Sequence, residues 1–120
     1  MSIDLAVRSA QDVELHEARG GLLGVAAQIA ALEAQRIRLE ARVFDIAFAR
    51  MSGQRMSVRD QEMELRSIAM ELGIPLRIHD RSMQRRLTDA ASLVERFGMT
   101  VDALEAGRIN VAHMREIHRA

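Results

Sequence analysis

A long apolar stripe between residues 22 and 51 constrains the fold of this chain more than any other feature. Its members recur in steps of four and three residues, with Arg36 interrupting the series once: Val25, Ile29, Leu32, Leu39, Val43 and Ile46. This spacing places them on one face of an α-helix. Ile37, Phe44 and Met51 widen the stripe on one side. A stripe this broad predicts a helix that packs against several others in a bundle.

The length of this helix predicts a partner. Thirty helical residues span about 45 Å, whereas a compact domain of this size has a radius of gyration of only about 14 Å. Part of the stripe should therefore project beyond the rest of the chain. Either a second copy or sequence outside these residues would cover it, and we expect a homo-oligomer that forms through the six stripe residues.

The segment before this helix leaves two alternatives open. Residues 3–18 also show helical spacing, and Gly20, Gly21 and Gly24 follow them. The glycines indicate either a break between two helices or a weak point in one long helix, at a cost of about 1 kcal/mol per glycine.

Composition supports an all-α fold in one domain over residues 1–120. The chain has three Phe, no Tyr or Trp and one Pro, so strand-forming residues are few. With no Cys, disulfides and thiolate zinc sites are excluded. The 17 basic residues, all arginine, balance 17 acidic ones.

Since no apolar run is long enough for a membrane span and the N-terminus does not resemble a secretory signal, we expect a cytoplasmic protein with no membrane partner.

Residues 57–97 resemble a helix-turn-helix unit. Ser57 is expected to cap a helix that stops at Gly73, and Asp80 a helix with Met83, Leu87, Ala90 and Val94 facing inward. Ile68-Ala69 and Leu72-Gly73-Ile74 fit the front half of the motif, in which a small residue permits close crossing and glycine permits a left-handed turn. Residues 75–79 form a longer connection than a tight motif would have.

Residues 100–120 predict two further short helices. Thr100 is expected to cap the first, which ends at Gly107, and Asn110 the second. The second runs to Ala120 without a stop signal, which indicates that this end is truncated.

Arginines cluster where the second helix of the motif begins. Residues 77–86 contain four arginines and only one acidic residue, Asp80, so this window is basic in an otherwise neutral chain. The arginines are Arg77, Arg81, Arg85 and Arg86. They are candidates for phosphate contacts, with Gln84 the candidate for a base edge. The alternative is a solvated helix face on which Arg85 pairs with Asp89. The sparse aromatics argue against stacking on single-stranded bases.

Motifs for catalysis are absent from the sequence. The glycines at 20–24 lack the strand and Lys of a phosphate loop, and no Gly-x-Ser-x-Gly elbow occurs. His113 and His118 are five residues apart, the wrong helical phase for gripping one zinc ion. We therefore expect no metal, no cofactor, no small-molecule substrate and no catalytic residue.

Three segments resemble the 13E12-repeat family: Asp-Arg-Ser-Met-Gln-Arg-Arg-Leu-Thr-Asp-Ala (80–90), Leu-Val-Glu-Arg-Phe (93–97) and Leu-Glu-Ala-Gly-Arg-Ile-Asn-Val-Ala-His (104–113). Members are helical domains of unknown function, commonly N-terminal to an HNH endonuclease module. Many of them have proline where Gly98 stands here. The nuclease motif itself is absent from these residues, so the resemblance transfers no catalytic residue.

The resemblance implies a bacterial or phage protein with an accessory role, such as holding duplex DNA or pairing subunits for a nuclease located elsewhere. One alternative is a structural oligomerisation or protein-interaction module without DNA contact. Another is a small standalone regulator.

Overall fold

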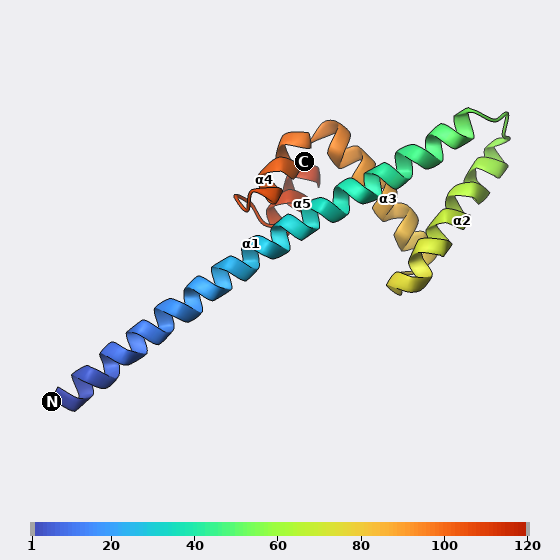
Figure 1. Cartoon of the computed structure of the whole chain (residues 1–120). Helices are drawn as coiled ribbons and strands as arrows, with labels where there is room; N and C mark the ends of the chain where they lie inside the picture. The colour runs from blue at the N-terminus through green and yellow to red at the C-terminus, as the bar shows by residue number, and fades with distance from the viewer. Residues whose placement is uncertain (1, 120) are drawn as a thin grey trace.

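The computed structural model describes residues 2–119, which contain five helices and no strand. The helices are α1 (Ser2–Ser52), α2 (Val58–Leu76), α3 (Asp80–Arg96), α4 (Gly98–Glu105) and α5 (Val111–Arg119). α1 runs the length of the molecule, and the other four gather along its C-terminal half (Figure 1). This arrangement confirms the all-α prediction.

α1 is continuous through the three glycines, so it begins at Ser2 and not at the predicted residue 22. A Cβ atom added at Gly20, Gly21 or Gly24 would meet nothing within 4 Å. These glycines therefore serve no close approach within the chain, and the alternative of a weak point in one long helix holds. α1 ends at the predicted Ser52-Gly53, where the Gly53 N–H donates to the Ala49 carbonyl at 3.0 Å.

The face of α1 that packs against other helices is not the predicted stripe. Its buried members are mostly alanines: Ala30, Ala34, Ile37, Ala41 and Ala47. Five of the six stripe residues are exposed and Val43 is half-buried. The prediction of a bundle helix is confirmed, since α1 packs against α2, α3 and α4. The predicted contact face is wrong for five of the six stripe residues, because small side chains let α3 and α4 approach α1 closely and leave the larger ones outside.

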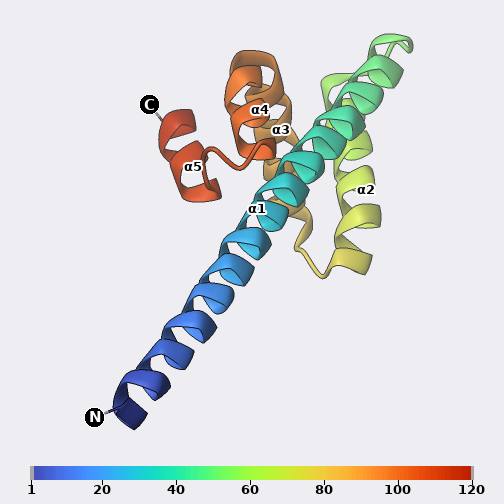
Figure 2. The ribbon, with the colours of Figure 1, turned by 60° about the vertical axis from the view of Figure 1, so that its left-hand side comes forward.

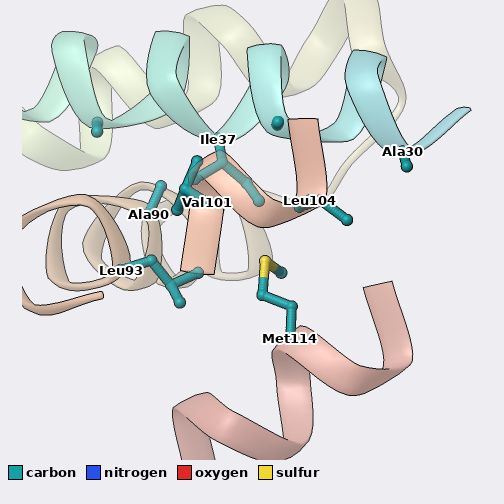
Figure 3. Packing of buried hydrophobic residues seen from close by; sticks show 9 residues of the cluster. Ala30, Ile37, Ala90, Leu93, Val101, Leu104 and Met114 are labelled. Atoms are coloured by element: carbon teal, nitrogen blue, oxygen red, sulfur yellow. The ribbon is translucent and has the colours of Figure 1, made fainter. Parts of the chain in front are cut away.

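Two apolar clusters hold the helices together. In the first, four residues of α1 pack against Ala90 and Leu93 of α3, Val101 and Leu104 of α4, and Met114 of α5 (Figure 3). The four are Ala30, Ala34, Ile37 and Ala41. The second joins Ala69 of α2 to Met83 and Leu87 of α3, with Val43 and Phe44 of α1 alongside. Because α3 contributes to both clusters, it is the central element of the packing.

The N-terminal half of α1 projects away from these clusters (Figures 1 and 2). Every residue from 3 to 26 is exposed. We call residues 3–26 the arm and residues 27–119 the body. The arm gives the molecule extents of 81 × 29 × 21 Å and a radius of gyration of 21.3 Å. The expectation that part of the long helix extends beyond the rest of the chain is confirmed.

Several helix ends lie where the sequence predicts them. Ser57 Oγ accepts from the Asp60 N–H at 3.2 Å, and Asn110 Oδ1 accepts from the His113 N–H at 2.8 Å. Gly107 ends α4 in the left-handed conformation, φ 73°. These signals are local, so they are not overridden by packing.

Other helix ends differ from the predictions. α2 continues through Gly73 and Pro75 to Leu76, and α3 is capped by His79 in place of Asp80. α4 begins at Gly98 directly after α3, so Thr100 is not its cap. On α3, Leu93 is only 5% exposed and Val94 is 38% exposed, because α4 and α5 cover the Leu93 side.

Candidate nucleic-acid interface

The turn between α2 and α3 is short and ordered by backbone hydrogen bonds. It consists of residues 77–79, and Arg77 adopts the left-handed conformation at φ 57°. The Arg77 N–H donates to the Ile74 carbonyl at 3.2 Å, and the Ile78 N–H donates to the Gly73 carbonyl at 2.8 Å. This pairing is the Schellman arrangement. The expected left-handed residue was Gly73, but the helix extends further and Arg77 takes that place.

Gly73 is nevertheless required, for a different reason. It is buried inside α2, and a Cβ atom at this position would collide with the carbonyl oxygen of Ile78. The absent side chain therefore lets the turn fold back onto its own helix. Since this brings α3 directly behind α2, the connection is tighter than the predicted residues 75–79.

Polar side chains fix the first turn of α3. His79 Nδ1 accepts from the Arg81 N–H at 3.2 Å, and Arg66 Nε of α2 donates to Asp80 Oδ2 at 3.2 Å. Desolvation acts to raise the pKa of Asp80, but the hydrogen bonds from Arg66 and the Arg81 N–H, with the charges of His79 and Arg66, lower it overall. The start of α3 is therefore tied to α2.

The predicted arginines divide into two groups. Arg77, Arg81 and Arg85 are exposed, and no carboxylate of residues 2–119 lies within 4 Å of their guanidinium groups. Arg86 turns inward, where its Nε donates to Glu40 Oε2 at 3.0 Å. The prediction that Arg86 contacts DNA is therefore not supported by its position, and the suggested pair between Arg85 and Asp89 does not form.

Glu40 is the centre of a charged network that joins α1 to α3. The carboxylate is 7% exposed and accepts from Arg36 Nη1 at 2.6 Å as well as from Arg86. Arg36 also donates to Glu33 at 2.6 Å. Desolvation alone would lower the pKa of Arg36, but the hydrogen bond to Glu33 and the charges of Glu40 and Glu33 raise it. This network explains why Arg36 interrupts the stripe.

The structure adds arginines that the sequence analysis missed. Arg59 and Arg66 of α2 line a surface depression of about 620 Å³ together with Arg81 and Gln84 of α3. Glu62 lies on the same rim. In the sequence, Arg59 and Arg66 are far from the cluster, and only their spacing of seven residues, which places them on one helix face, could have pointed to them. Gln84 thus lies beside arginines from both helices.

Other types of site are not evident in the described part of the chain. Within residues 2–119, no three histidine or acidic residues gather as a set of metal ligands. No described helix combines the length and the apolar character needed to cross a bilayer.

Comparisons of this chain with known protein families, with curated proteins and with solved structures give no match.

Proposed function

We propose that this chain is a non-catalytic helical module that contacts duplex DNA through the turn before α3 and the first turns of α3. One observation carries the proposal. Arg77, Arg81 and Arg85 all emerge at this end of α3, and none is neutralised by a carboxylate of residues 2–119. In a chain with equal numbers of basic and acidic residues, such a cluster is a local excess of positive charge.

The chemistry of the cluster suits a phosphate backbone. Guanidinium groups bind phosphate oxygens through two parallel hydrogen bonds and stay charged at any physiological pH. Arg59 extends the basic surface onto α2, whereas Arg66 beside it is paired with Asp80. Gln84 between the helices can present its amide to a base edge. Phosphate contacts would position the module, with little sequence information of their own.

An accessory role follows from the resemblance to the 13E12-repeat family. In that role the module would hold duplex DNA for an HNH nuclease located downstream or on another chain. None of the residues described above forms a catalytic arrangement, so cleavage would have to come from that other module.

A salt titration tests the proposed interface. The logarithm of the DNA affinity should fall linearly with the logarithm of the salt concentration. The double variant Arg81→Ala/Arg85→Ala should bind more weakly, with a slope shallower by about 2, since each lost phosphate contact removes roughly 0.9. Gel shifts on duplex DNA at several salt concentrations measure both quantities.

The matched control is Arg96→Ala/Arg108→Ala, which removes the same charge from exposed positions outside the cluster. This control should retain the original slope. If both double variants lose the same affinity, the effect comes from overall charge and the proposed interface is wrong.

A second candidate function is oligomerisation without DNA contact. The observation in its favour is the apolar surface of α1, where Val25, Ile29, Leu32, Leu39 and Ile46 are each at least half exposed. Light scattering should then show a mass that rises with concentration, and Leu32→Asp should abolish that rise. A constant monomeric mass would count against this candidate and leave the DNA proposal untouched.

A further inference from the structure

An apolar groove lies beside the exposed stripe of α1. Its volume is about 480 Å³. Its floor is Leu32, Leu39 and Val43 of α1, and its wall is formed by the C-terminal end of α2 and the turn after it: Leu72, Leu76 and Ile78. Leu32, Leu39 and Leu76 are each more than half exposed. The body therefore presents a concave apolar surface next to α1.

The arm and the start of the body carry an apolar series of the same spacing. It continues the stripe towards the N-terminus in steps of three and four: Leu15, Ala18, Leu22, Val25 and Ile29. All five are exposed. The complete series from Leu15 to Ile46 is a heptad seam of the kind that packs helix against helix. One half of the seam is a bare helix, and the other half is the floor of the groove.

Within residues 2–119, the arm contributes no residue to either apolar cluster. Isolated helices are marginally stable in water, and three glycines weaken this one further. A partner that covers the arm would supply the missing stabilisation. The seam runs over residues 15–46, about 47 Å at 1.5 Å per residue. Together with the groove wall it offers a continuous apolar surface to a second copy.

We infer that two copies of this chain pair antiparallel, so that the seam half preceding Leu32 in each copy lies in the groove of the other. Leu15 then lies opposite Ile46 of the second copy, Leu22 opposite Leu39, and Ile29 opposite Leu32 next to the two-fold axis. This inference specifies the partner in the second candidate function and is independent of DNA binding. The interface is isologous and closed, so both grooves are filled at once.

Two observations favour the antiparallel orientation. The first is steric: no other helix lies on the arm (Figure 1), so its side chains can face the groove, whereas a parallel pair would bring together two segments of α1 that already carry α2 and α3. The second is electrostatic. A parallel pair places Arg36 opposite Arg36, and like charges across a seam repel, whereas the antiparallel pair places Arg36 opposite Val25. Glu14 and Arg19 would attract in the parallel pair, but both are exposed and such pairs contribute little.

Engineered cysteines test the orientation, because the natural chain has none. A disulfide requires Cα atoms closer than about 7 Å. In the antiparallel dimer, residue 15 lies next to residue 46 of the other copy and about 45 Å from residue 15. An equimolar mixture of the full-length Leu15→Cys and Ile46→Cys variants, mildly oxidised, should therefore give a covalent dimer on a non-reducing gel. Each variant alone should stay uncrosslinked.

Substitutions in the groove wall test its role. Leu76→Asp places a charge in the groove and should raise the dissociation constant of the dimer about tenfold or more. The control is Ile74→Asp, because Ile74 is exposed on the same helix end but lies outside the groove. It should change the dissociation constant by less than about threefold. Sedimentation measures the dissociation constants, and circular dichroism verifies folding. Equal effects of the two variants would overturn the groove assignment.

Two further results would distinguish an error in the orientation of the two copies from an absence of dimerisation. Crosslinking of Leu15→Cys with itself would overturn the antiparallel arrangement but retain self-association. A monomeric mass at every concentration would overturn both and leave the groove for a different partner.

Discussion

At the scale of single residues, Glu40 is the clearest case of a side chain whose environment determines its role. It is a nearly buried carboxylate on the helix face that meets α3, and it accepts hydrogen bonds from Arg36 and Arg86. Burying a charge without partners is costly, so the two guanidinium groups are needed where they are. The same contact pairs Arg86, which is half-buried, with a carboxylate of α1, unlike the neighbouring Arg81 and Arg85.

We expect Glu40→Gln to lower the free energy of unfolding by about 1.5–3 kcal/mol, because a charged hydrogen-bond acceptor is lost and two arginines keep their charge without it. Glu95→Gln is the control, since Glu95 is exposed and forms no ion pair with the described residues. Urea unfolding measures both variants. Equal midpoints would show that the network adds nothing to stability.

A second residue-scale prediction concerns glycine. Gly73→Ala should lower the free energy of unfolding by about 1–3 kcal/mol, because the added methyl group collides with the Ile78 carbonyl and the turn must shift. Gly20→Ala adds the same group to the arm, where nothing lies within 4 Å. That control should not lower the urea midpoint. A Gly73→Ala protein as stable as the natural chain would contradict the close approach.

At the scale of elements, the joint between α2 and α3 depends on contacts that cross it. Arg66 of α2 bonds Asp80 of α3, the Gly73 carbonyl receives the Ile78 N–H, and Ala69 is completely buried where the two helices cross. These contacts fix the direction in which α3 leaves the turn. They therefore also fix where Arg81 and Gln84 lie relative to Arg59.

The lowered pKa of Asp80 predicts a pH dependence at this joint. The ionised carboxylate stabilises the folded state at pH values above its unfolded pKa, near 3.9, and this contribution is lost as the pH falls through the lower folded pKa. The stability difference between the natural chain and Asp80→Asn should thus persist at neutral pH and disappear in acid. Asp89→Asn is the exposed control, and denaturant midpoints from pH 7 to about pH 2 measure the effect, because the loss is complete only below the folded pKa.

At the scale of the whole molecule, the structure separates a packed body from an unpacked arm. The body has its clusters on the alanine face of α1, and the arm has none. In such a molecule, local stability must differ along a single helix. In the inferred dimer, the second copy would supply the packing that the arm lacks among the described residues.

Hydrogen exchange should detect this difference. In dilute solution the amides of residues 3–26 should exchange rapidly, while those of Ala34, Ile37 and Ala41 remain protected in the core. If the inferred dimer forms at higher concentration, the arm should become protected there as well. Arm protection that does not change with concentration would contradict the proposed pairing.

The candidate site was only partly accessible from sequence. The basic window at 77–86 identified Arg77, Arg81 and Arg85 because charge density is visible along the chain. Arg59 and Arg66 were missed, and Arg86 was misplaced, because their positions depend on how α2, α3 and α1 pack. Whether an arginine meets phosphate or an internal carboxylate is a property of the partner face, which no local pattern contains.

Local sequence signals specify the helices and many of their ends, since helix propensity and the caps Ser57, Gly107 and Asn110 act within one turn of the backbone. The sequence also shows that α1 is too long for one compact domain. Only the tertiary structure decided which face of α1 is inside. Two faces of that helix are apolar, and the one with small side chains was buried because close packing favours near approach of the helices.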